Sequence, residues 1–166
     1  VYVLGAEGSL HALEAASGRK LWKINLVEEF GGKVPKWGFS TSPLIEGDLL
    51  LLEVGGVDGS FIVDMIIART TQATAVALDK STGRPTWTAL DDKMSYSSPI
   101  AYNLEGSRQI AFSNAYALVG LSPADGSELW RYPFKTRWDV TAATPVFIPP
   151  NRLFTSGGSS GAVVRA

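Results

Sequence analysis

The sequence predicts an all-β protein built from repeated units of four short antiparallel strands. An eleven-residue pattern, ALDKSTGRPTW at Ala77 to Trp87, recurs at Ala12 to Trp22 and at Gly120 to Trp130. A proline opens an apolar, strand-like segment in three places, because proline is tolerated at the first position of a strand and poorly inside one. The content of 17 glycines and 9 prolines fits a chain with many turns. The three strand-opening prolines are Pro43, Pro99 and Pro145.

Taken in order, the chain begins with three strands, which alternating apolar residues and intervening glycine turns indicate. These strands cover residues 1–6, 9–15 and 21–26. A glycine-rich connection follows over residues 27–41. Each later unit begins at one of the three prolines with two strands, and the two whole units continue with the hairpin that carries the eleven-residue pattern. The chain is thus one domain, residues 1–166, with a partial unit at 1–26, whole units at 42–90 and 98–134, and a partial unit at 144–166.

The first whole unit is longer than the second because of an insertion at residues 58–72. This insertion is unusually apolar for a loop. We interpret it either as a lengthened hairpin or as a contact surface.

In each copy of the pattern, a short polar turn closes on a glycine four residues before a tryptophan. That tryptophan falls on the next strand, where we expect its ring to lie buried between two neighbouring sheets. Burial of such a ring contributes about 1.5 to 3 kcal/mol. The three tryptophans expected to hold sheets together in this way are Trp22, Trp87 and Trp130.

A period of about 40 to 45 residues with four strands per unit is typical of a β-propeller blade. Residues 1–6 align with the second strand of a whole unit, residues 48–54. Residues 161–166 align with the third strand, residues 74–79. We therefore expect an incomplete arc of two whole blades and two partial blades. Because such an arc exposes strand edges, it is either a piece of a longer protein or a subunit that joins copies into a ring.

The eleven-residue pattern resembles the tryptophan-docking repeat of pyrroloquinoline-quinone (PQQ)-like β-propellers, Ala-x-Asp-x-x-Thr-Gly-x-x-x-Trp. The copy at Ala77 to Trp87 matches every position of that repeat. The first copy keeps the alanine, the glycine and the tryptophan, and the third keeps only Gly126 and Trp130. The resemblance covers essentially the whole chain.

The resemblance implies two alternative functions. Quinoprotein alcohol and sugar dehydrogenases of this family hold PQQ and calcium at the propeller centre, and many stack the quinone against a disulfide of adjacent cysteines. This chain has no cysteine, and no acidic constellation for calcium can be carried over. BamB-like outer-membrane-assembly propellers use the same repeat without a cofactor to scaffold protein partners. Either alternative implies a periplasmic or secreted protein.

Composition narrows the classes of partner. Fifteen basic and 16 acidic residues give a net charge of -1, which argues against nucleic acid as the main partner. No apolar run approaches the roughly 18 residues of a membrane-spanning helix. The chain begins at Val1 without a charged and then apolar leader, so we expect no signal peptide within it.

No catalytic or metal-binding residue is predicted. Residues 157–161, GGSSG, match the G-x-S-x-G string of a hydrolase nucleophile elbow. That elbow requires a helix after the serine and a later histidine, whereas the single histidine of this chain is His11. We expect a turn at residues 157–161 instead.

The candidate site lies on the connections between the last strand of one unit and the first strand of the next. In a propeller these connections converge on one face around the central channel. Each of the three pairs a cation with an aromatic ring, which suits a partner with apolar and anionic character. The alternative is that these aromatic residues only wedge adjacent blades. The candidate contact residues are Lys36, Trp37, Tyr96, Arg137, Trp138 and Asp139.

From the residues and the resemblance together, we expect a non-catalytic scaffold or binding module without a cofactor. Its channel face would bind a protein or small-molecule partner. The first alternative is a fragment of a PQQ-dependent dehydrogenase, which would use PQQ with calcium. The second is a carbohydrate-binding face built on Trp37, Tyr96 and Trp138.

Overall fold

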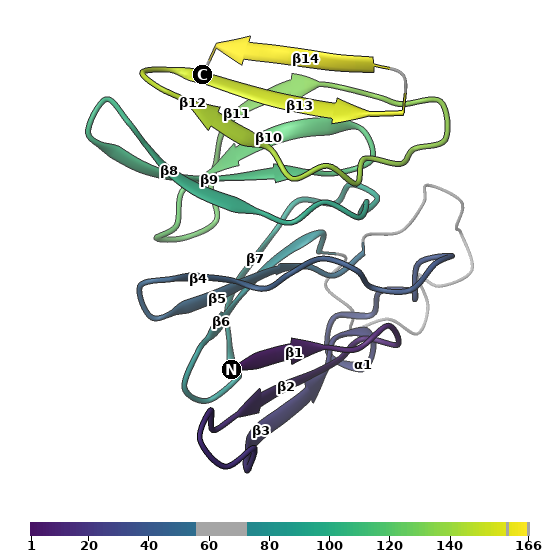
Figure 1. The fold of residues 1–166 in the computed structure, drawn as a ribbon, viewed down its shortest axis with the longest axis vertical. Helices are drawn as coiled ribbons and strands as arrows, with labels where there is room; N and C mark the ends of the chain where they lie inside the picture. The colour runs from purple at the N-terminus through teal and green to yellow at the C-terminus, as the bar shows by residue number, and fades with distance from the viewer. Residues whose placement is uncertain (56–72, 159, 166) are drawn as a thin grey trace.

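The computed structural model describes residues 1–55, 73–158 and 160–165. Within these residues the chain forms four antiparallel sheets that follow one another along an arc (Figure 1). The insertion predicted at residues 58–72 lies outside the described residues.

The two outer sheets have three strands each, and the two middle sheets have four. The first sheet contains β1 (Tyr2–Leu4), β2 (Ser9–Leu13) and β3 (Lys20–Asn25). The second contains β4 (Leu44–Glu46), β5 (Leu49–Glu53), β6 (Ala75–Asp79) and β7 (Pro85–Ala89). The third contains β8 (Ile100–Leu104), β9 (Ser107–Ser113), β10 (Ala117–Leu121) and β11 (Glu128–Pro133). The last contains β12 (Val146–Ile148), β13 (Arg152–Gly157) and β14 (Ser160–Arg165). The predicted arc of two whole and two partial blades is confirmed.

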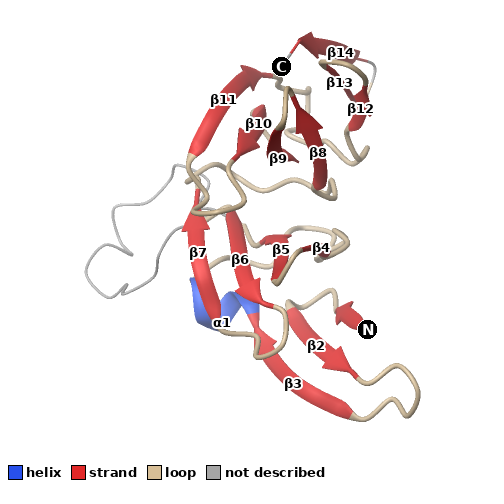
Figure 2. Cartoon of the chain, turned by 90° about the vertical axis from the view of Figure 1, so that its left-hand side faces the viewer, coloured by secondary structure: helices blue, strands red, loops and turns tan. Residues whose placement is uncertain are grey.

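Within each blade, the strands follow one another from the concave side of the arc to its convex side. Figure 2 shows β3, β7 and β11 along the convex side and β4, β8 and β12 along the concave side. The middle strands are the most buried, and all five residues of β10 are buried. On β5, Leu50 packs toward the first sheet and Leu51 toward the third. A strand covered on both faces is apolar at every position, which explains the run of four leucines at 49–52.

A short helix, α1 (Leu26–Phe30), takes the last residue of the strand predicted at 21–26 and the first part of the glycine-rich connection. The side chain of Asn25 caps it, accepting hydrogen bonds from the amides of Val27 and Glu28 at 2.9 and 3.3 Å. Gly31 ends it in the left-handed conformation, φ 67°. Leu26 and Phe30 are buried in the cluster between the first two sheets. The cap, the glycine and two apolar residues four apart therefore favour a helical turn over a loop.

The three copies of the eleven-residue pattern adopt the same turn. In each copy the glycine amide donates to the carbonyl oxygen four residues earlier, at 2.8 to 3.0 Å. All three hairpins also carry a register shift at the same position. In the complete copy, the Asp79 carboxylate accepts bonds from the amides of Ser81 and Thr82 at 3.0 and 2.8 Å. These bonds, with the hydroxyls of the same two residues, lower the pKa of Asp79 to about 2. The aspartate of the repeat therefore closes the turn.

Two of the three tryptophans lie across the turn of the following blade. The Trp22 indole donates to the Lys80 carbonyl oxygen at 3.2 Å, and its ring lies over Gly83. The Trp87 indole donates to the Pro123 carbonyl oxygen at 3.0 Å, and its ring lies over Gly126. We had expected buried rings, but both are only partly buried. They project from the outermost strand of each blade, which leaves one side near solvent.

Trp130 behaves differently from the other two. Its indole donates to the Gln109 side chain at 2.9 Å and the Tyr102 hydroxyl at 3.1 Å, so the ring folds back over its own sheet. A Cβ on Gly120 would meet the Trp130 Nε1 atom at 2.1 Å. The glycine that departs from the repeat pattern therefore makes room for the ring.

Candidate functional site

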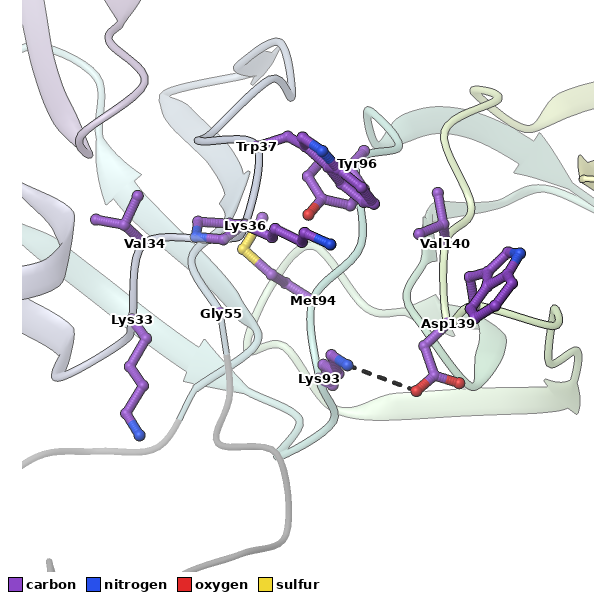
Figure 3. A pocket seen from close by; sticks show the side chains of 12 residues that line it. Lys33, Val34, Lys36, Trp37, Gly55, Lys93, Met94, Tyr96, Asp139 and Val140 are labelled. Atoms are coloured by element: carbon purple, nitrogen blue, oxygen red, sulfur yellow. Dashed lines mark hydrogen bonds and ion pairs between the residues drawn. The ribbon is translucent and has the colours of Figure 1, made fainter.

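The connections that follow β3, β7 and β11 meet on one face of the arc and line a pocket of about 710 Å³ (Figure 3). The first and third connections form opposite walls, and the second lies between them (Figure 3). The lining residues are Lys33, Val34, Pro35, Lys36, Trp37, Gly55, Lys93, Met94, Tyr96, Trp138, Asp139 and Val140.

Five of the six residues predicted for the site line this pocket, and Arg137 does not. The Arg137 guanidinium instead lies 5.0 Å from the ring centroid of Trp138 and so supports the wall from outside the lining. Lys93, the cation of the connection that supplies Tyr96, and its neighbour Met94 also line the pocket but were not among the candidate contact residues. No sequence pattern pointed to Gly55, because it follows β5 and not the outer strand of a blade.

The first wall is aromatic and cationic. The rings of Trp37 and Tyr96 approach within 5.5 Å between centroids, at an interplanar angle of 56°. The Lys36 ammonium lies 5.1 Å from the Trp37 ring centroid, within the range of a cation–π contact. Trp37 remains 62% exposed and Trp138, on the opposite wall, 72% exposed. Two large exposed rings therefore stand at the rim of one pocket.

The third connection is shaped by a left-handed residue. Asp139 has φ 55°, a conformation that aspartate tolerates better than most residues. The Thr136 hydroxyl closes this turn, since it donates to the Val140 carbonyl oxygen at 2.8 Å and accepts from the Val140 amide at 2.9 Å. The Asp139 carboxylate then lies 3.5 Å from the ammonium groups of both Lys93 and Lys135.

The second and third connections are joined by buried hydrogen bonds. The Thr141 carbonyl oxygen accepts from the Ser95 hydroxyl at 2.9 Å and the Tyr96 amide at 3.1 Å. The Ser95 amide donates to a carboxyl oxygen of Glu53 at 3.2 Å. The other Glu53 carboxyl oxygen has no hydrogen-bond partner among the described residues. These bonds hold the second and third connections in one relative position.

Glu53 is the fully buried acid of this region. Burial raises the pKa of Glu53 well above its ordinary value, and the charge of Asp92 raises it further, whereas the bond from Ser95 acts in the opposite direction. Glu53 therefore keeps its proton to a higher pH than an exposed glutamate does.

The chemistry of the pocket suits anions rather than cations. Lys33, Lys36 and Lys93 line it together with a single carboxylate, that of Asp139. Calcium needs roughly six to eight oxygen ligands, and this donor set does not fit it. In the described parts of the chain, no group of three or more histidine, cysteine or acidic residues is placed to hold a metal ion. We derive no metal-dependent step from this site.

The sheets and the pocket define an open segment of a β-propeller with a pocket on its connection face. The chain belongs to the family described as "Outer membrane protein assembly factor BamB", whose model matches residues 1–166. No curated protein matches the sequence closely enough to be counted a relative. Among the described residues, no helix is long and apolar enough to cross a membrane.

Solved structures share the fold at low sequence identity. The quinohemoprotein alcohol dehydrogenase ADHIIG from Pseudomonas putida HK5 superposes with a TM-score of 0.55 at 16% identity over 93% of this chain. The computationally designed Ika4 protein superposes with a TM-score of 0.58 at 8% identity over 99% of this chain. The chain spans 26% of the dehydrogenase and 83% of the designed protein. At these identities the likeness establishes the PQQ-like propeller fold alone.

Proposed function

We propose that this chain is a non-catalytic scaffold or binding module that presents its connection-face pocket to a partner. The observation that carries the proposal is the convergence of Lys36, Trp37, Tyr96, Trp138 and Asp139 on one pocket from three successive connections. Tryptophan, tyrosine and cationic side chains dominate the energetics of binding interfaces. A role as wedges alone would not leave Trp37 and Trp138 62% and 72% exposed.

The charges of the pocket support binding more than catalysis. A general acid or base needs a group that is free to exchange a proton with a substrate. The single lining carboxylate, Asp139, lies between two ammonium groups at 3.5 Å each, so both ion pairs already engage it. The dehydrogenase alternative rests on the shared fold, and fold alone does not supply a site. By family membership we propose a periplasmic or secreted location, with a protein partner, the blades of a longer chain or further copies completing the ring.

Reconstitution with PQQ and calcium tests the non-catalytic proposal. Purified chain is incubated with both, desalted, and assayed for bound quinone absorbance and for dye-linked oxidation of primary alcohols. We expect no turnover above that of a sample lacking the chain. Quinone retained together with alcohol oxidation would overturn the proposal in favour of the dehydrogenase alternative.

Photo-crosslinking tests the binding face. A benzoylphenylalanine replaces Trp37 in one sample and Leu21, which is 53% exposed on the outer strand β3, in the control. Both are irradiated in an extract of the source organism. We expect discrete adducts from position 37 that are absent from position 21. Identical adduct patterns from the two positions would contradict a partner site at the pocket.

A further inference from the structure

We propose that the pocket binds an extended peptide segment that carries a carboxylate side chain two residues from a large apolar side chain. This inference rests on the proposed function, because it names the partner chemistry of the same pocket. A carbohydrate and a small anionic molecule are the competing occupants, and the structure argues against each.

Charge is the first argument. Lys33, Lys36 and Lys93 line the pocket with one aspartate, so its lining is cationic although the chain as a whole has a net charge of -1. The charge of Asp139 is already compensated by Lys93 and Lys135. Lys36 forms no ion pair with any carboxylate of the described residues. A partner that brings a carboxylate therefore finds an available ammonium group.

The faces of the aromatic rings argue against a carbohydrate. A sugar stacks on the open face of an indole, but the Lys36 ammonium lies over Trp37 at 5.1 Å and the Arg137 guanidinium over Trp138 at 5.0 Å. Trp37 also meets Tyr96, at 5.5 Å between ring centroids. A sugar stacked on the face that the cation covers would have to displace that cation, and a neutral sugar offers the cation nothing in return.

The spacing of charge and apolar surface defines the sequence pattern of the peptide. The Lys36 ammonium and the Trp37 ring are 5.1 Å apart, so a ligand that contacts both carries a carboxylate and an apolar group at a similar separation. Side chains two residues apart on an extended strand lie on one face and are separated by about 6.6 Å. An Asp or Glu two positions from an aromatic or leucine residue meets this requirement.

The exposed rim favours a polypeptide over a small molecule. Trp37 and Trp138 rise on opposite walls and are 62% and 72% exposed, so a ligand confined to the pocket leaves both largely in water. A chain that crosses the pocket covers both rings and gains their hydrophobic area. The bonds from Ser95 and Tyr96 to Thr141 fix the second and third connections relative to each other in advance, which lowers the entropic cost of binding.

A random library of twelve-residue peptides displayed on phage is the probe. The library is selected on the immobilised chain, and the most enriched peptide is synthesised with a second version in which its acidic residues become amides. We expect enriched sequences to carry Asp or Glu two residues from Phe, Trp, Tyr or Leu. We also expect the amide version to bind at least tenfold more weakly, and the affinity to fall as salt is raised.

Two double variants with the same change in charge locate the effect. Lys33→Gln with Lys36→Gln removes two cations from the pocket, whereas Lys20→Gln with Lys23→Gln removes two exposed cations from β3. We expect at least a tenfold loss of affinity from the pocket variant and less than a twofold loss from the β3 variant. Equal losses, or enriched peptides without acidic residues, overturn the inference.

A third variant separates failure of this inference from failure of the proposed function. If peptides bind without acidic residues but lose affinity in Trp37→Ala with Trp138→Ala, the peptide chemistry is wrong and the binding pocket stands. If nothing is enriched, or if the enriched peptides bind this double variant unchanged, both are wrong.

Discussion

The tryptophan contacts between blades can be measured by adding a single methyl group at a glycine. Gly83 and Gly126 occupy the same position of the repeat as Gly18, and all three have left-handed φ angles, of 73°, 75° and 70°. A Cβ on Gly83 would lie 2.7 Å from the Trp22 ring, and a Cβ on Gly126 2.5 Å from the Trp87 ring. A Cβ on Gly18 would meet no atom within 4 Å. Gly18→Ala is therefore a matched control.

The expected magnitudes follow from these contacts. The left-handed conformation costs an alanine about 1 to 2 kcal/mol at each of the three positions. Forcing the indole aside adds the cost of overpacking, about 1 to 3 kcal/mol, at Gly83 and Gly126 only. The free energy of unfolding should thus fall by about 1 to 3 kcal/mol more for Gly126→Ala than for Gly18→Ala.

Urea unfolding followed by circular dichroism measures this difference as a lower midpoint at unchanged slope. A double-mutant cycle that combines Gly126→Ala with Trp87→Ala then tests the cause. Once the ring is removed, Gly126→Ala should lower the free energy of unfolding no more than Gly18→Ala does. Equal losses from Gly18→Ala, Gly83→Ala and Gly126→Ala in the presence of both rings would refute the assigned contact.

Three further predictions concern buried and turn residues. The raised pKa of Glu53 lets the folded state keep a proton that the unfolded chain releases. Stability should therefore fall as pH rises from about 4.5 through the folded pKa. Glu53→Gln should make the melting temperature less dependent on pH between about pH 4 and about pH 8. Gly120→Ala should cost about 1 to 3 kcal/mol in urea by displacing Trp130. Gly5→Ala, whose Cβ would meet nothing closer than 3.5 Å, is its control. Asp79→Ala should lower the melting temperature at neutral pH, and its difference from the parent should vanish as pH falls through the Asp79 pKa of about 2.

The repeat in the sequence is sufficient to predict most of the fold. Its three copies share a turn whose hydrogen bonds lie within a few residues, as the Asp79 carboxylate and the Ser81 amide illustrate at 3.0 Å. Interactions of this kind depend only on residues close together in the sequence. The strand order and the partial first and last blades could therefore be predicted. The convergence of Trp37, Tyr96 and Trp138 could be predicted too, because the connections of a propeller share one face.

The helix α1 was readable in principle from Asn25 and Gly31, but a glycine-rich connection concealed it. Other features depend on contacts between segments far apart in the chain. Trp130 folds back because Gly120 leaves room and because Tyr102 and Gln109 offer hydrogen-bond acceptors. Gly120 in place of the repeat's alanine is a visible departure, but its meaning depends on Tyr102 and Gln109, which lie on other strands.

The same physical reason separates the predicted part of the site from the part that only the tertiary structure decided. An aromatic residue beside a lysine in a loop is visible in the sequence, whereas burial is a property of the whole assembly. Glu53 ends a strand of leucines and gives no sign that it will be fully buried and bonded by the Ser95 amide from another connection. Its raised pKa, and the bonds that join the second and third connections, arise only when these distant segments pack together.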